Sequence, residues 1–155
     1  IIVEYSKATY NKLSQTNHYE VARLEGSLLD NLPDFDLEEL VISYIQVKYD
    51  YYVLSNSIAS KSTTIKVECE FLSRDPKWVR KAVVQVKGRK AEALDALQFA
   101  DFTQNGYEVF LFAPEVLNAD KVDNIVVITP NELIDFYENY KVILPDSITQ
   151  WENLY

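Results

Sequence analysis

The sequence has one cysteine, three glycines, one histidine and no methionine among its 155 residues. The single cysteine, Cys69, excludes an internal disulfide framework and a cysteine-rich zinc site. Three glycines argue against a glycine-rich phosphate loop, and the lone His18 leaves a histidine-based metal cluster or catalytic dyad incomplete.

Long apolar runs are also missing. No run reaches the roughly 18 apolar residues of a membrane span, and the start has no signal-peptide pattern. We therefore expect a soluble, cytoplasmic protein that has no membrane partner. The length fits one domain and is short for two. The missing methionine and the start at Ile1 indicate a fragment, a processed chain or an altered sequence, so a homodimer or a place in a larger protein stays open.

Charge is distributed unevenly along the chain. The formal net charge is −9, but residues 61–90 hold nine cations and three carboxylates, a local balance of +6 that leaves −15 elsewhere. This asymmetry indicates an anionic ligand beside the basic segment. The alternative is a solvated basic hairpin on an acidic protein. The cations expected to contact such a ligand are Lys77, Arg80, Lys81, Arg89 and Lys90.

Hydrophobic periodicity predicts alternating helices and strands. Helices are expected over residues 6–30 and from an N-cap at Asp36 to about Tyr49. Further expected elements are strands at 51–55, 64–72, 82–87, 107–113 and 124–128, a loop at 56–62, a turn at 73–76, a helix at 91–104, and a capping box at 129–132 that opens a helix to about 141. Residues 82–113 then form a right-handed parallel crossover.

Polar and apolar residues alternate on the two central strands. Because alternate side chains of a strand share a face, Gln85 and Lys87 stand side by side, and Glu68 and Glu70 form the polar set of the preceding strand. If these strands pair as a hairpin, carboxylate, amide oxygen and ammonium converge on one patch. Oxygen ligands suit a hard cation such as Mg²⁺, and a neighbouring lysine can orient or deprotonate a water. The alternative is an ordinary solvent face of a sheet.

Cys69 belongs to the opposite, apolar set of its strand, with Val67 and Phe71. This position predicts a buried structural thiol rather than a nucleophile. The tyrosines at positions 44, 49, 51 and 52 could stack on bases in a single-stranded groove, although such tyrosines more often form the edge of a core.

The order helix, three antiparallel strands, helix, strand between residues 36 and 113 resembles the core of the PD-(D/E)xK nuclease superfamily. Within it, the chain is most similar to the Mrr-like restriction-endonuclease branch, whose final motif is Q-x-K. The resemblance rests on segments 37–41 and 51–53, on Glu70, and on Gln85-Val86-Lys87. It implies an α/β fold with an αβββαβ core at 36–113 and a mixed central sheet flanked by helices. A helical extension (1–35) precedes this core and a strand-helix extension (114–155) follows it.

The resemblance also implies a function, metal-dependent hydrolysis of DNA with Mg²⁺ or Mn²⁺. Glu70 would be the metal-binding carboxylate, with Glu68 as its alternate. Gln85 would coordinate the metal or its water through the side-chain oxygen, and the Val86 carbonyl would add a ligand. Lys87 would position the nucleophilic water and stabilise charge on the phosphate.

Glu38 resembles the first-helix glutamate that borders such sites, and a helix-dipole role beside Asp36 explains it equally well. Two departures from the family pattern are visible. Gln85 supplies no charge, and the proline-aspartate pair is absent before Glu68. They leave open a catalytically inactive scaffold that binds nucleic acid or protein.

Overall fold

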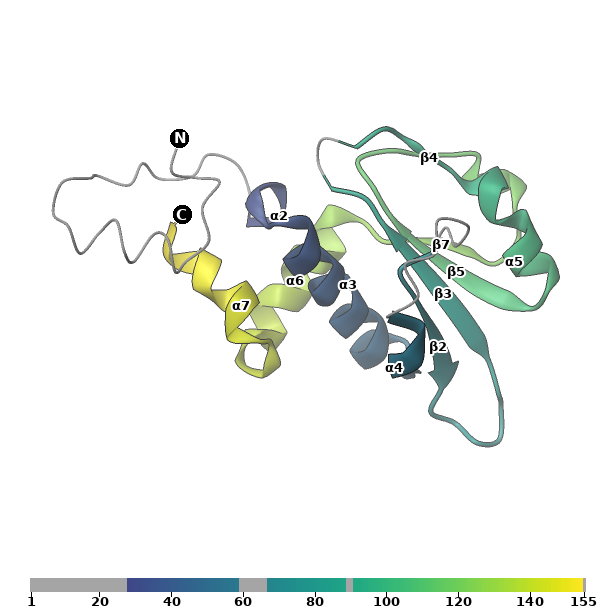
Figure 1. Ribbon diagram of the computed structural model, residues 1–155, viewed down its shortest axis with the longest axis horizontal. Helices are drawn as coiled ribbons and strands as arrows, with labels where there is room; N and C mark the ends of the chain where they lie inside the picture. Colours follow the sequence, from purple (N-terminus) through teal and green to yellow (C-terminus); the bar gives the residue numbers. More distant parts are fainter. Residues whose placement is uncertain (1–27, 59–66, 89–90, 155) are drawn as a thin grey trace, which may run out of the picture.

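A five-stranded mixed sheet forms the centre of the protein, in a computed structural model that describes residues 28–58, 67–88 and 91–154 (Figure 1). The strand order is β1-β2-β3-β5-β7, with β1, β2 and β3 antiparallel and β3, β5 and β7 parallel. A separate parallel pair joins β4 to β6. The strands are β1 (Tyr51–Val53), β2 (Cys69–Ser73), β3 (Lys81–Val86), β4 (Leu94–Asp95), β5 (Tyr107–Phe112), β6 (Val116–Leu117) and β7 (Ile125–Val127).

Helices cover the sheet. Figure 1 shows α3, α6 and α7 gathered on one side of it, with β4 and α5 on the other. The α-helices are α2 (Leu28–Asn31), α3 (Asp34–Lys48), α4 (Ser55–Ile58), α5 (Ala100–Gln104), α6 (Pro130–Tyr140) and α7 (Asp146–Thr149). The 3-10 helices are η2 (Ala96–Phe99), η3 (Ala119–Lys121), η4 (Lys141–Ile143) and η5 (Gln150–Leu154). None of the helices in the described ranges is long and apolar enough to cross a membrane.

Two apolar cores lie on the two faces of the sheet. On one face Val84 and Phe110 pack in the cluster that contains the apolar stripe of α3 and residues of α6 and α7. On the other face Val83, Val109 and Leu111 pack against β4 and η2. The central strands β3 and β5 are thus buried on both sides, as the near-continuous apolar run of residues 107–113 predicts for β5.

Most expected elements are confirmed: the antiparallel trio, the parallel return strand, and the capping box of α6, in which Thr129 and Glu132 bond reciprocally. The coarse prediction of an α/β fold with a mixed sheet flanked by helices is therefore correct. Of the helix expected over residues 6–30, all but the last residues lie outside the described ranges. The loop expected at 56–62 begins instead with α4.

The single helix expected over 91–104 is wrong. Leu94 and Asp95 pair with β6, so the helical part begins only at η2. Asp95 stabilises this break, because its carboxylate accepts hydrogen bonds from the Leu97 backbone N–H and from the Asn118 amide, both at 3.0 Å. Tertiary pairing therefore overrides the helical propensity of the alanines.

The N-cap expected at Asp36 is also wrong. The N-cap of α3 is Pro33, three residues earlier, and the Asp36 side chain is buried in the first turn of the helix. Its Oδ2 accepts a hydrogen bond from Trp151 Nε1 at 3.0 Å, which ties α3 to η5. Burial raises the pKa of the Asp36 carboxyl, and the hydrogen bond from Trp151 partly opposes this rise.

This carboxylate predicts a pH dependence of stability. The folded state holds the Asp36 proton more tightly than the unfolded state, so its contribution to stability falls as pH rises from the ordinary pKa of 3.8 through the raised native value. Asp36→Asn keeps an acceptor for Trp151 and removes the charge. We expect the unfolding free energy of this variant minus that of wild type, both measured by urea titration, to increase as pH rises across that window. A relative fall would contradict the assignment, and Trp151→Phe, which removes the donor, should widen the window.

Candidate functional site

Strand pairing brings Glu68 to Gln85. The β2–β3 register sets Cys69 opposite Val84, and one step further the Glu68 backbone N–H donates to Val84 O at 2.7 Å. The Gln85 side-chain Nε2 donates to Glu68 Oε1 at 2.9 Å. Gln85 is only 6% exposed, so this bond satisfies an amide that would be costly to leave unpaired. The expected approach of a carboxylate to the amide is therefore made by Glu68, the alternate.

Glu70 lies on the same face but two positions along the strand. Its register partner is Val83, and its backbone N–H and C=O bond to Ser57 Oγ and Leu54 N at 2.8 and 2.9 Å. A step of two residues moves a side chain by about 7 Å along a strand. The structure therefore separates the two candidate glutamates, and Glu70 is not among the residues of the pocket described next.

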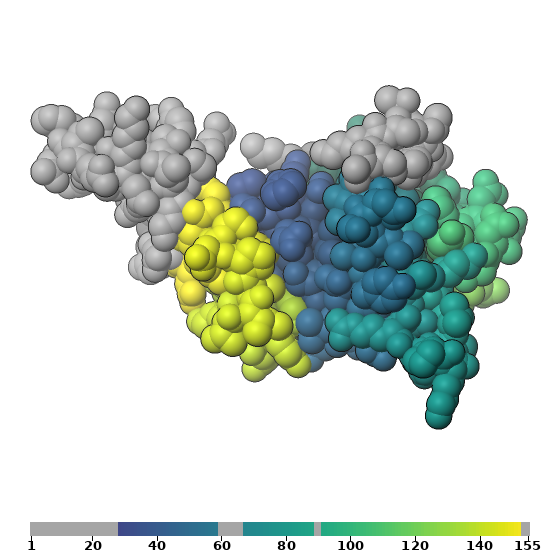
Figure 2. All heavy atoms as spheres, turned by 60° about the horizontal axis from the view of Figure 1, so that its bottom comes forward, coloured from purple at the N-terminus to yellow at the C-terminus, as the bar shows by residue number. Residues whose placement is uncertain are grey.

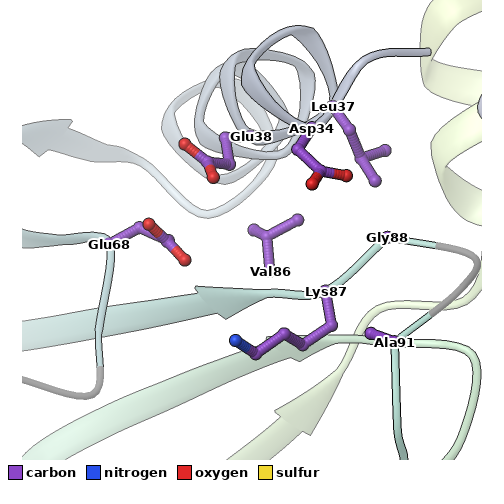
Figure 3. A pocket seen from close by; sticks show the side chains of 8 residues that line it. All are labelled: Asp34, Leu37, Glu38, Glu68, Val86, Lys87, Gly88 and Ala91. Carbon is purple, nitrogen blue, oxygen red and sulfur yellow. The ribbon is translucent and has the colours of Figure 1, made fainter.

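An open pocket of about 250 Å³ lies between the start of α3 and the end of β3. Figure 3 shows the helix on one side and the strand on the other, with Glu38 and Glu68 pointing toward the space between them. In that view the Lys87 side chain extends toward the side where Glu68 lies. The lining residues are Asp34, Leu37, Glu38, Glu68, Val86, Lys87, Gly88 and Ala91.

Gly88 lies against the side chain of Asp34, the first residue of α3. A side chain at position 88 would meet the Asp34 carboxylate, so a larger residue would displace that carboxylate at the edge of the pocket. Asp34 and Glu38 stand one helical turn apart and so present both carboxylates on one face of α3. Sequence reasoning missed Asp34 because it began the helix too late, and the i, i+4 spacing from Glu38 is the signal that could have found it.

Carboxylates make the surroundings of the pocket electronegative. Cys69, on the reverse face of β2 and 1% exposed, shows their effect. Burial raises the pKa of its thiol to about 12, and the charges of Glu68, Glu39, Glu38 and Glu70 add to the rise. A thiol of this kind is not a nucleophile at neutral pH. The prediction that Cys69 is buried is confirmed, while Val67 packs on the opposite core from Phe71.

The candidate metal ligands at the pocket and beside it are all oxygens. The Glu68 and Glu38 carboxylates and the Val86 carbonyl could hold a cation at the pocket, while Gln85 is not among its lining residues and is joined to it through Glu68. This donor chemistry, with the Gln85 amide oxygen added, suits Mg²⁺ or Mn²⁺. The Gln85 Nε2 also lies 3.4 Å from Val86 O, so the amide spans the two neighbouring acceptors. Within the described ranges, no group of three or more histidine, cysteine, aspartate or glutamate side chains is arranged to hold a metal ion. A cation here would depend on Gln85 and backbone oxygen as well as on carboxylates.

Three of the five basic residues expected to bind an anion, Lys77, Arg80 and Lys81, lie at the other end of the hairpin. Arg80 is partly buried, with its guanidinium carbon 4.9 Å from the centroid of the Tyr51 ring, and its Nη2 donates to Tyr49 O at 3.3 Å. Lys81 is exposed, and its ammonium lies 4.5 Å from the centroid of the Tyr107 ring. Lys77 lies in the exposed turn. Arg89 and Lys90 lie outside the described residues.

The length of β3 therefore separates this basic end from the pocket. Its six residues span about 20 Å at roughly 3.3 Å per residue. Of the four tyrosines considered for base stacking, Tyr44 and Tyr51 are buried and make edge-to-face contacts with Phe136 and Phe110, so they belong to the core, while Tyr52 is exposed.

No protein-family model, curated protein or solved structure gives a significant match to this chain.

Proposed function

We propose that the protein is a metal-dependent deoxyribonuclease built on a restriction-endonuclease-like scaffold. The observation that carries the proposal is the 2.9 Å hydrogen bond between Gln85 and Glu68 at a pocket that also contains Glu38 and Lys87. The resemblance to the Q-x-K branch of the PD-(D/E)xK superfamily named Gln85, Lys87 and Glu38, with Glu70 as the leading carboxylate and Glu68 as its alternate. With the short α4, β4 and η2 set aside, the element order α3, β1, β2, β3, α5, β5 is compatible with that scaffold.

The residues would divide the work by their chemistry. Glu68 and Gln85 would hold Mg²⁺ or Mn²⁺, with the Val86 carbonyl and Glu38 as further oxygen donors. When bound, the cation would supply Lewis-acid stabilisation of the phosphate and a more acidic water. Lys87 would orient the attacking water and place positive charge beside the phosphate oxygens, where negative charge develops in the transition state.

The defining experiment is a cleavage assay on purified protein with varied cations. Mg²⁺ or Mn²⁺ should support nicking or cutting of DNA, and EDTA should abolish it. Ca²⁺ should support binding with little cleavage, because the larger ion accepts loose coordination that does not align the water. Binding without cleavage on duplex, single-stranded and modified substrates alike would contradict the enzyme.

That outcome would favour a second candidate, a catalytically silent module that binds nucleic acid or protein. One observation supports it already. The Gln85 amide directs its N–H donors to Glu68 and to the Val86 carbonyl, so the pair is satisfied as it stands and could serve the fold alone. The cleavage assay separates the two candidates.

A further inference from the structure

The turn between β2 and β3 projects from the body of the protein. In Figures 1 and 2 the teal segment between these strands extends beyond the rest of the surface. Hydrogen bonds hold it in shape: Ser73 Oγ donates to Trp78 O at 3.0 Å and accepts from the Arg80 N–H at 2.9 Å, and Asp75 Oδ1 accepts from the Lys77 N–H at 2.9 Å. We call residues 74–80 the hairpin tip. It is a fixed projection rather than a loose loop.

The tip carries an exposed indole that the fold holds in place. Trp78 is 68% exposed, whereas Trp151, the other tryptophan of the sequence, is 2% exposed. The guanidinium of Arg80 lies between two rings, 5.1 Å from the Trp78 centroid and 4.9 Å from that of Tyr51. Arg80 thus links the exposed ring to the buried aromatic core, and this support limits the entropy that Trp78 would lose on binding a partner.

The charge around this indole fits a polyanion. Residues 74–81 carry four cations and one carboxylate, a balance of +3 on a chain whose net charge is −9. The carboxylate, Asp75, is engaged in the turn itself, where its backbone and side-chain oxygens accept from Trp78 and Lys77. An aromatic ring flanked by exposed cations is the combination that binds single-stranded nucleic acid, in which bases stack on rings while lysines contact phosphates.

We infer that the hairpin tip is a stacking platform for an unpaired segment of DNA, with Trp78 as the ring that receives a base. A base inside a duplex is covered on both faces, so only an unpaired or end base can stack on the indole. This inference rests on the proposed function and names its substrate class, DNA that contains a single-stranded segment.

Lys81 and Lys87 stand at the two ends of the β3 line, about 20 Å apart at roughly 3.3 Å per residue, and β3 itself is buried on both faces between them. That length corresponds to about six stacked nucleotides at roughly 3.4 Å each. A single-stranded segment on the tip and a phosphate at the pocket can therefore belong to one DNA molecule.

Tryptophan fluorescence tests the platform without any cleavage. The full chain is titrated with oligothymidylate, with the same sequence as a duplex, and with polyglutamate, all in EDTA. Because Trp151 is buried, a change in emission reports on Trp78. We expect oligothymidylate to quench the emission in a salt-dependent manner and to bind more tightly than the duplex. Polyglutamate should cause no quenching. Equal quenching by polyglutamate, or none by oligothymidylate, overturns the proposal.

Variants separate stacking from apolar contact. Trp78→Ala should weaken oligothymidylate binding, measured by anisotropy of a labelled strand, by about tenfold or more, and Trp78→Phe should restore most of it. Trp78→Leu keeps apolar bulk without a ring and should bind as weakly as the alanine variant. Val79, 73% exposed in the same tip, supplies the matched control, since Val79→Ala should change affinity by less than about twofold. Tight binding by Trp78→Leu, or equal losses in the tryptophan and valine variants, overturns the proposal.

Failure of the platform and failure of the enzyme give different results. The platform is measured in EDTA, where no cleavage occurs, and the enzyme by metal-dependent cutting. Quenching without cleavage under any cation retains the platform on a silent scaffold. Cleavage without quenching retains the enzyme and rejects the platform.

Discussion

Replacing Lys87 with alanine is expected to lower the rate of metal-dependent DNA cleavage by about a hundredfold or more while changing DNA affinity little. Removing one preorganised group that stabilises transition-state charge typically costs about 10²–10³ in rate. Lys87 is exposed at the rim of the pocket, so its truncation leaves the core intact. Single-turnover cleavage and equilibrium binding in Ca²⁺ measure the two effects separately.

The chain contains its own control for this experiment. Gln46-Val47-Lys48 repeats the tripeptide on α3, and the Lys48 ammonium lies 4.9 Å from the centroid of the Tyr140 ring, away from the pocket. Lys48→Ala should leave cleavage near the wild-type rate. Full activity of the Lys87 variant, or equal losses in the two lysine variants, would remove Lys87 from the site.

Alternation along two strands was enough to predict which residues share the site face, but not which glutamate meets the amide. A shift of two residues in the pairing register leaves every side chain on the same face of the sheet. Alternation alone therefore does not decide whether Glu68 or Glu70 lies beside Gln85. The observed register sets Glu70 beside Val83, and a shift of two residues would set it beside Gln85 instead. The turn between β2 and β3 sets the register through the hydrogen bonds of the Ser73 side chain with Trp78 and Arg80. These partners lie beyond the expected turn at 73–76, so the sequence did not predict the register.

The other differences have tertiary causes. The apolar stripe of α3 and the buried strands β3 and β5 follow from periodicity, because each element must bury its apolar face. The break at Leu94 depends on a partner strand more than 20 residues away, which local propensity does not contain. The exposure of Trp78 likewise depends on the projection of the turn, which the local sequence does not show.

The last prediction compares the two glutamates. Glu68→Gln should lower metal-dependent cleavage by about a hundredfold or more, because it removes the carboxylate charge beside Gln85 and with it most of the attraction for a divalent cation. The new amide keeps an oxygen that can accept the Gln85 hydrogen bond, so the melting temperature should stay near that of wild type. Glu68→Ala would in addition leave a buried amide unpaired, at a cost of about 1–3 kcal/mol in unfolding free energy.

Glu70→Gln is the matched variant on the same strand and the same face. Glu70 lies two register pairs away from Gln85, so this change should reduce cleavage by less than about tenfold, consistent with a long-range charge effect only. Cleavage rates at increasing Mg²⁺ concentration distinguish the two, because loss of a ligand raises the concentration needed for half-maximal rate. If Glu70→Gln is the more damaging change, the metal-binding carboxylate is Glu70, and the hydrogen bond between Glu68 and Gln85 serves the fold rather than the chemistry.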